Sequence, residues 1–590
     1  MRKRTSDGAM LSKQFYRLLP IQILLCLIGA VNGIVSSLFA SNYIGAEALS
    51  AVALYNPINL FVTAVSTMLV GGAQILCGKY MGQNQVDNTR GVFTLDMVLS
   101  GIISAVIIAV MVLGALTGAT RVFTADPTVL HIFNQYLLGM AIGIAPLMFG
   151  NQFAAFLSLE NKTRLTIAAS VIYIAANILL NFVFVGVMHM GAFGLALASS
   201  LGLWIYFAVQ GQYFLSGKSL MRFDRGQMRW SLAGKIAGIG IPGAASNAYQ
   251  AVRGVIVNLL IVKYVGELGL SAFGAGESVL RLFWAVPSGM AAVLRMLMSV
   301  SYGEEDRKSL CEEMRIGLIQ CPLVQLAISC GIIALAVPFT HMFFRDPAAP
   351  VYDMTVWYFR LLPLCMPLSV IYLHFVTHAQ VAGKQLFVHI MSLLDGVVCV
   401  SLFSLLLIKP LGMKGVYIAS TLNGLVTLAV AVLWAWAKKK RFPRRMEELM
   451  AMDDDFGAAE DARLDVSLRS AAEVSQLSER VQRFCLDRGV DQRRSYLAGL
   501  FLEEMTANVV EHGFTKDRKK HSADVRVVHK DDTVILRIKD DCVPFDPAER
   551  QSIVTPEDPT KNIGIRMVYA MAEDIKYQNI LGLNVLTIRI

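Results

Sequence analysis

The chain has 590 residues, of which 55% are apolar and only 16% are charged. A soluble domain carries about 25% charged residues, so most of this chain is expected to lie outside water. This composition excludes a disordered chain, a collagen and a small disulfide scaffold, and the length leaves room for more than one domain.

The charges are unevenly distributed along the chain. In residues 1–440 roughly one residue in nine is charged, and the net charge is +13. In residues 441–590 roughly one residue in three is charged, and the net charge is −4. The first part is typical of a membrane domain and the second of a soluble one. The basic excess lies mostly at predicted membrane edges, where positive charge sets orientation, so it does not indicate nucleic-acid binding.

Twelve apolar stretches in the first part are long enough to cross a bilayer, which takes about 20 residues each. Their centres lie near residues 29, 62, 104, 142, 175, 204, 247, 283, 326, 366, 397 and 426. The first stretch follows MRKR, as a signal peptide would, but it is too long for one and is expected to be a retained helix.

Loop charges predict the orientation of these spans. With the N-terminus inside, the inside loops carry thirteen Lys and Arg residues and the outside loops carry five. The KKKRFPRR run after the last span is also inside, so both termini are expected in the cytoplasm. The nine cysteines are scattered without metal-binding spacing, which argues against zinc and disulfides.

The membrane half contains an internal repeat. The segment AVNGIVSSLFASNYIGAEALSA at 30–51 matches AVRGVIVNLLIVKYVGELGLSA at 251–272. The same constant offset relates Gly82 to Gly303 and Pro146 to Pro367. It predicts two six-helix halves that run in the same direction, an architecture of transporters with the substrate site between the halves. The alternative is an ancient duplication that now serves only as a scaffold.

These features resemble the multidrug and toxin extrusion (MATE) family over roughly residues 10–440. The resemblance rests on the 6+6 repeat, the helix-opening Pro20 and Pro242, and the LSAV and LSAF runs that follow YIG and YVG. It implies a secondary antiporter that exchanges Na⁺ or H⁺ for small organic substrates. Many members carry an Asp and a Glu where this chain has Ser36 and Gln250, so the usual coupling acids are missing.

Three other carboxylates fall in or near apolar spans, where a charge costs at least ~2.5 kcal/mol and is a functional candidate. Asp395 has no partner nearby in the sequence, and Arg253, in the middle of the seventh span, is expected to face either Asp395 or an anionic substrate. Glu277 and Asp96 have local explanations, since Glu277 precedes Arg281 by one helical turn and Asp96 is near enough to a membrane edge to snorkel. Uncharged polar residues in the spans either line a cavity or join helices: Asn32, Asn177, Asn181, Gln250 and Asn258.

The second part, after an acidic linker at 441–461, has the pattern of an α+β two-layer sandwich. Strands are predicted at 463–469, 523–530, 532–540, 575–580 and 584–590, and helices at 471–487, 493–512 and 564–575. In LEEMTANVVEHGF, Glu504, Asn508 and His512 share one helix face, and such oxygens can hold Mg²⁺ and polarise a hydroxyl. Asp540 ends a strand, and Gly564 opens a helix whose free N–H groups favour phosphate.

The order of these motifs resembles the GHKL ATP-binding superfamily, and most closely the anti-sigma-factor serine kinases, over residues 462–590. The resemblance implies roles for Glu504 as general base, Asn508 as Mg²⁺ ligand, Asp540 as adenine reader and Gly564 as phosphate contact. It also implies a lid at 547–562, ATP and Mg²⁺ as cofactors, and a protein substrate of the anti-anti-sigma (STAS-like) kind. His512 also matches a family position, next to the proposed ATP and Mg²⁺ residues. Two family glycines are replaced, by Cys542 and Asn562.

The sequence therefore predicts an inner-membrane protein of a bacterium, with a twelve-helix domain at 1–440, repeats at about 10–220 and 231–440, and an ATP-binding domain at 462–590. The first hypothesis is an antiporter regulated by, or signalling through, its kinase-like tail. The second is a receptor that binds a ligand in the membrane and switches the tail without net transport. A third is a tail that only docks another protein.

Overall fold

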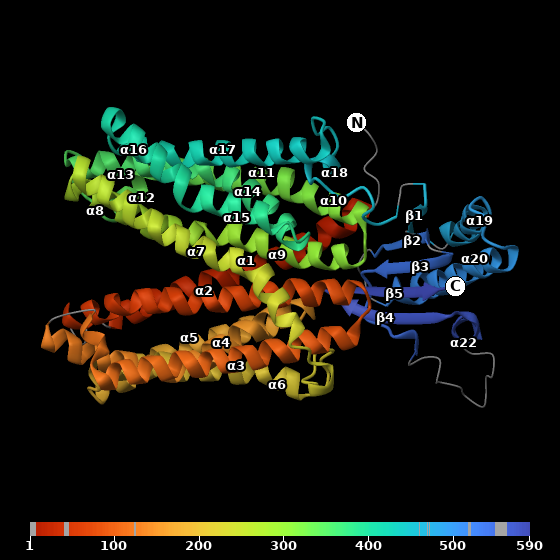
Figure 1. Cartoon of the computed structure of the whole chain (residues 1–590), viewed down its shortest axis with the longest axis horizontal. Helices are drawn as coiled ribbons and strands as arrows, with labels where there is room; N and C mark the ends of the chain where they lie inside the picture. The colour runs from red at the N-terminus through yellow and green to blue at the C-terminus, as the bar shows by residue number, and fades with distance from the viewer. Residues whose placement is uncertain are drawn as a thin grey trace.

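A computed structural model of the chain describes residues 7–39, 46–122, 126–458, 461–468, 470, 472–516, 521–530, 532–548 and 563–590. Within these ranges the side chains of 7–9, 28–38, 46–53, 472 and 475 lie outside the description. Figure 1 shows two long helical bundles side by side, with a smaller α+β domain packed against one end of them. The predicted fold class, an all-α membrane domain followed by an α+β sandwich, is confirmed.

The first half of the membrane domain follows the predicted spans. Its elements are α1 (Asp7–Phe39), α2 (Ala46–Gly82), α3 (Val86–Thr117), η2 (Ala119–Val122), α4 (Pro127–Leu159), α5 (Thr163–Asn181), η3 (Phe182–Val187) and α6 (Gly191–Leu215). A short turn, η4 (Arg225–Gln227), lies in the connection to the second half.

The second half repeats this plan with more interruptions. Its elements are α7 (Ser231–Tyr264), α8 (Glu267–Phe283), α9 (Ala285–Gly303), α10 (Arg307–Arg315), η5 (Ile316–Gln320), α11 (Cys321–Ala334), α12 (Ala336–His341), α13 (Pro350–Leu361), η6 (Leu362–Leu364), α14 (Cys365–Val381), α15 (Gln385–Leu393), η7 (Leu394–Val398), α16 (Cys399–Leu411) and α17 (Met413–Lys439).

Ten helical segments among the described residues are long and apolar enough to cross a membrane. α1 and α7, with 33 and 34 residues, are the other two segments that twelve spans require, so the exact number stays a prediction. Pro20 and Pro242 do not open their helices as expected, because α1 and α7 begin at Asp7 and Ser231 and both prolines lie inside them.

The two halves converge at one end of the bundle, here called the tail-side end, and diverge toward the other (Figure 1). The contact at the tail-side end is made by glycines of α2 and α9. A Cβ added to Gly82 would meet the Val300 carbonyl oxygen at 2.3 Å, and one added to Gly303 would meet the Lys79 carbonyl oxygen at 2.1 Å. These two glycines are equivalent in the repeat, and their missing side chains let the backbones touch.

The tail domain is a five-stranded antiparallel sheet of order β1-β2-β3-β5-β4, covered on one face by helices. Its elements are β1 (Arg463–Leu468), α19 (Ala472–Leu486), α20 (Gln492–Asn508), η8 (Val509–Gly513), β2 (Ala523–Lys530), β3 (Thr533–Asp540), α22 (Ile563–Met571), β4 (Asp574–Ile580) and β5 (Leu583–Arg589). The short helix α18 (Met446–Leu449) precedes them in the linker and packs against α10 and α17 of the membrane half. The helix expected at 564–575 ends earlier, at Met571, because its last residues enter β4.

Alternation along β2 and β3 gives the sheet two different faces. Val525, Val527 and Ile538 are buried with side chains of the helices in the tail core. Their neighbours Arg526 and Lys539 emerge on the opposite face, toward the membrane half. The sheet is therefore a middle layer between its own helices and the tail-side end of the bundle.

Candidate functional sites

Asp395 sits in the membrane half at a π-helical turn, η7, between α15 and α16. The Nη1 of Arg253 on α7 donates a hydrogen bond to the Asp395 carbonyl oxygen at 3.2 Å. The Nδ2 of Asn423 on α17 donates to the Asp395 carboxylate at 2.8 Å. Three helices thus bring an acid, a base and an amide together, and π turns of this kind often occur at functional sites.

Asn423 was not among the polar residues selected from the sequence, although it is an amide in an apolar span like Asn258. It is 4% exposed, and its Oδ1 has no hydrogen-bond partner among the described residues. Buried amide groups are normally fully bonded, so this oxygen is available to a cation or a substrate donor.

Asp96 on α3 is completely buried, and neither carboxylate oxygen has a hydrogen-bond partner in the described part of the chain. The snorkelling explanation is therefore wrong. An ionised carboxylate without a partner is very costly in such a place, so Asp96 is chemically suited to take up a proton or a cation. Glu277 on α8 accepts a hydrogen bond from the Tyr358 hydroxyl at 3.1 Å, and within the described residues it makes no ion pair with Arg281.

The uncharged polar candidates separate into two groups. Asn181 donates to Asn177 at 2.6 Å and Asn177 donates to Ser199 on α6 at 3.3 Å, which joins α5 to α6. Gln250 is exposed and donates to Ser246 one turn earlier on α7. The side chain of Asn32 lies outside the described residues.

In the tail, Asp540 ends β3 on the helix-facing side of the sheet and is 6% exposed. Its Oδ1 accepts hydrogen bonds from the Cys542 N–H at 3.0 Å and from Asn584 Nδ2 at 2.8 Å. Burial raises the pKa of the Asp540 carboxyl above its usual value, against these hydrogen bonds. Cys542, which replaces a family glycine, is not among the residues with positive φ, so this position does not need glycine for its backbone shape.

Asn584 is a site residue that the sequence did not reveal. It is 4% exposed, and it lies directly opposite Asp540 in the pairing of β3 with β5. Its Oδ1 in turn accepts from the Tyr577 hydroxyl at 2.8 Å. Only the strand register shows that these residues form one network.

Glu504, Asn508 and Gly564 come together between α20 and α22. Asn508 Nδ2 donates to the Glu504 carbonyl oxygen at 2.7 Å, which leaves the Asn508 Oδ1 for a cation. A Cβ added to Gly564 would meet Glu504 Oε2 at 1.9 Å, so this carboxylate lies directly against the start of α22 and would have to move for any larger residue. His512 is exposed in the π turn η8, one turn beyond Asn508.

This donor set fits MgATP. Asp540 offers a buried acceptor for an exocyclic amine, Asn508 an oxygen for Mg²⁺, and the start of α22 backbone N–H groups for phosphate. The predicted lid at 547–562 falls almost entirely outside the described residues. Among those described, the three cavities at the tail are not lined by Glu504 or Asn508; they lie on the side of the sheet that meets the membrane half.

His521, Asp541 and Cys542 have potential metal-ligand atoms within 4.8 Å of one another. Lys13 of α1 forms an ion pair with Asp541 at 2.5 Å, and His521 contacts the other carboxylate oxygen at 3.1 Å. An ammonium group already neutralises this carboxylate, so the cluster is explained as a contact between α1 and the tail.

Fold and sites together define a polytopic membrane protein of two repeated halves that carries an α+β domain of the nucleotide-binding kind. The chain belongs to the MatE family, whose model matches residues 20–183 and 242–406. Residues 468–590 match the model of the histidine kinase-like ATPase domain, so the tail has the predicted GHKL-like fold.

Curated relatives include the probable multidrug resistance protein NorM of Listeria innocua serovar 6a, 27% identical over 232 residues, 38% of this chain and 49% of that protein. The FAD transporter of Shewanella oneidensis is 22% identical over 345 residues, 56% of this chain and 74% of that protein. The chain spans about half the length of the first of these relatives.

Solved structures show the same membrane fold. A multidrug resistance MATE family transporter in an outward-facing conformation has a TM-score of 0.65 at 20% identity, covering 73% of this chain and 98% of its own. A MATE structure in the straight conformation has a TM-score of 0.67 at 19% identity, with the same coverage.

Proposed function

We propose that the chain is a secondary active transporter of a bacterial inner membrane, which exports small organic compounds in exchange for Na⁺ or H⁺ and is regulated by an ATP-binding tail. Membership of the MatE family supports the transport class. The observation that carries the proposal is the Asp395–Arg253–Asn423 cluster. It places charged side chains inside an apolar helical bundle, where they are costly and therefore indicate a functional site.

The coupling ion is proposed to bind at acids other than those usual in the family. Asp96 and Asp395 are the candidates. In the part of the chain that the structure describes, Asp96 has no hydrogen-bond partner, and the Asp395 carboxylate accepts a hydrogen bond from the side chain of Asn423 alone. Proton uptake or Na⁺ binding at either group would neutralise a buried charge and thereby favour a different helix arrangement.

The tail-side end is proposed to face the cytoplasm. The loops there carry most of the basic residues between spans, as the positive-inside rule requires, and the tail packs against the same end (Figure 1). Both termini would then be cytoplasmic.

The tail is proposed to bind MgATP and to act as a kinase of protein hydroxyl groups. ATP, when bound, supplies the phosphoryl group. Asn508 would hold Mg²⁺, Asp540 would accept the adenine amine, and Glu504 would take the proton of an attacking hydroxyl. The proposed substrate is a protein of the anti-anti-sigma (STAS-like) kind, and phosphorylation and transport would influence one another.

Nucleotide binding to the full chain in lipid nanodiscs tests the tail assignment. Asn508→Ala is expected to weaken MgATP binding about tenfold or more, the loss of one contact to a charged group worth roughly 1.5–3 kcal/mol. Gln492→Ala, an exposed amide at the other end of α20, is the matched control. If neither wild type nor control binds ATP with Mg²⁺ present, the tail is a docking module and the kinase proposal fails.

Uptake into proteoliposomes tests the transport assignment. Asp395→Asn is expected to abolish accumulation of a fluorescent organic cation driven by a Na⁺ or H⁺ gradient, because the amide can neither titrate nor bind the ion as a carboxylate does. Asp353→Asn, an exposed acid on α13, is the control. A wild-type protein that binds the dye but never moves it supports the receptor alternative, which the uncharged Gln250 favours.

A further inference from the structure

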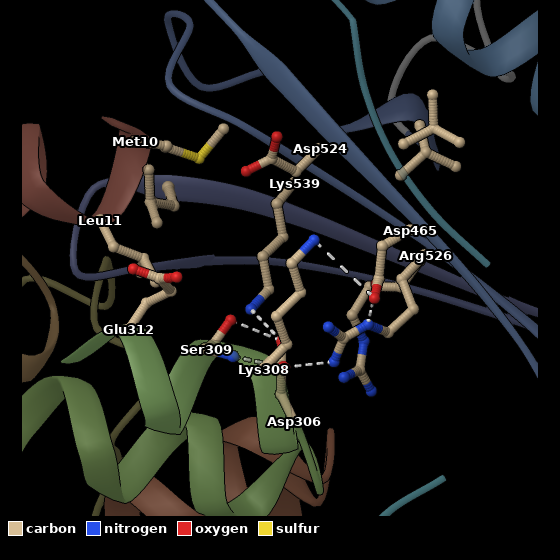
Figure 2. A pocket seen from close by; sticks show the side chains of 14 residues that line it. Met10, Leu11, Asp306, Lys308, Ser309, Glu312, Asp465, Asp524, Arg526 and Lys539 are labelled. Atoms are coloured by element: carbon tan, nitrogen blue, oxygen red, sulfur yellow. Dashed lines mark hydrogen bonds and ion pairs between the residues drawn. The ribbon is translucent and has the colours of Figure 1, made fainter. Parts of the chain in front are cut away.

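The outer face of the tail sheet forms ion pairs with the loop between α9 and α10. Lys539 and Arg537 on β3 pair with Glu304, and Arg526 on β2 pairs with Asp306. Figure 2 shows Lys539 and Arg526 reaching from the strands to Asp306 at the start of α10, around a cavity of about 50 Å³. The Glu304 and Asp306 side chains are only 1% and 6% exposed. Burial opposes the charge of Asp306, but Arg526 and Lys539 outweigh it and hold its pKa below the usual range.

The same sheet contacts the first half of the membrane domain through the β4–β5 turn. Leu581 at this turn is 2% exposed and belongs to the hydrophobic core of the membrane half. Its N–H donates to the Leu159 carbonyl oxygen at 3.2 Å, and Gln14 of α1 donates to its carbonyl oxygen. Asn84, between α2 and α3, donates to Thr587 on β5 at 3.1 Å. The tail therefore holds both halves at once.

The two loops that the sheet bridges are equivalent in the repeat. The constant offset that relates Gly82 to Gly303 also relates Asn84 to Glu305, and both have left-handed backbones, with φ of 57° and 53°. Each lies two residues after the glycine, Gly82 or Gly303, where the halves touch. Parallel-repeat transporters change access by rocking one half against the other, so opening the tail-side end would separate these two loops. A rigid sheet bonded to both loops opposes that separation.

We propose that the tail is a clamp that keeps the tail-side end of the transporter closed, and that the tail must release one half before this end opens. The pairs of Arg537 and Lys539 with Glu304 are the latch on the second half, and the β4–β5 turn is the anchor on the first. The inference rests on the proposed function, because opening at this end matters only to a protein that moves a substrate.

The test measures the distance between the two halves directly, by electron–electron double resonance on the full chain in nanodiscs. Spin labels are carried by an unnatural amino acid at two exposed positions, Asp87 in the first turn of α3 and Arg315 at the end of α10. This labelling leaves the nine free cysteines untouched. The wild type is expected to show one short separation. Arg537→Glu with Lys539→Glu is expected to add a longer separation in at least about half of the molecules.

Two further variants complete the design. Arg480→Glu, an exposed charge reversal on the far side of the tail, is expected to keep the short separation. Glu304→Lys added to the Arg537→Glu, Lys539→Glu protein re-creates both charge pairs with their signs exchanged. It is expected to restore the short separation, which distinguishes loss of the latch from misfolding of the tail. The clamp is overturned if the double reversal leaves the separation unchanged, or if the restored pair stays open. The distance measurement uses no substrate and no nucleotide. A failure of the clamp proposal would therefore not contradict the transport and ATP-binding proposals, which have separate tests.

Discussion

Asp540 combines a buried position with an acceptor role, and these two properties predict how nucleotide binding depends on pH. Its pKa is raised because burial disfavours the charged form. As the pH falls through that raised value, the carboxylate takes up a proton and its second oxygen turns from acceptor into donor. The contact with an adenine amine is then lost at a higher pH than an ordinary aspartate, with a pKa of about 3.9, would allow.

We therefore expect ATP affinity of the wild type to fall on acidification, and the affinity of Asp540→Asn to be lower at pH 7 but to lack this acid step. Isothermal calorimetry of both proteins between pH 5 and 8 measures the ratio of the ATP affinity of the wild type to that of Asp540→Asn. Because the phosphates of ATP titrate equally in both experiments, the ratio isolates Asp540. A ratio that stays constant over this range would remove Asp540 from the adenine contact.

At the scale of residues, sequence spacing predicts contacts between residues that are close together in the chain. Glu504 and Asn508 are one helical turn apart, so their proximity follows from spacing alone, whereas the grouping of Asp540 with them was implied by the family resemblance. Asn584 and Asn423 could not be found in this way. Each acquires its role from a residue 28 to 44 positions away, through strand register in one case and helix packing in the other.

At the scale of elements, the contact of α2 with α9 depends on two glycines. Gly303→Leu is expected to force the helices apart, since even a Cβ would approach the Lys79 carbonyl oxygen to 2.1 Å and backbone cannot move away cheaply. The label pair at Asp87 and Arg315 should report a longer separation, and the melting temperature should fall by several degrees, as a loss of about 1–3 kcal/mol from overpacking implies.

Gly331→Leu is the matched control for this prediction. Gly331 lies on α11, where nothing lies within 4 Å of an added Cβ, so the same substitution adds bulk without a clash. Equal shifts in separation for both variants would show that the glycine pair does not set the distance between the halves.

The repeat predicted this contact only in part. The offset identifies Gly82 and Gly303 as equivalent positions, but not that they pack near each other across the approximate symmetry axis. For Pro20 and Pro242, by contrast, the sequence prediction was wrong. Proline is common at helix starts, yet α1 and α7 extend one or more turns further toward the tail, because residues such as Gln14 have partners there that only the folded molecule supplies.

At the scale of the whole molecule, the docking of the tail lay beyond the reach of sequence patterns. Its contacts join residues more than 200 positions apart, such as Lys539 with Glu304 and Asn84 with Thr587. The difference in charged-residue content between the two parts of the chain distinguishes the membrane part from the α+β part. It gives no information on which basic residues of the tail meet which acids of the bundle.

Docking and nucleotide binding meet at one turn, because Asp540 and Asp541 are adjacent. Asp540 faces the proposed adenine site, while Asp541 pairs with Lys13 of α1 and accepts from the Ser522 N–H at 3.0 Å. Although burial opposes its charge, these partners hold the pKa of Asp541 below its usual value. Docking thus fixes the turn that presents Asp540, and a preorganised site binds its ligand more tightly.

Lys13→Ala is therefore expected to weaken ATP binding roughly fivefold, while Arg480→Ala leaves it unchanged. Coupling between two equilibria is reciprocal, so ATP must favour the docked tail by the same factor. Saturating ATP should then shorten the mean label separation in the Arg537→Glu, Lys539→Glu protein, and this shift should shrink when Lys13→Ala is added. If ATP closes the halves equally well without Lys13, the coupling does not pass through Asp541, and the link between nucleotide and clamp must lie in another contact.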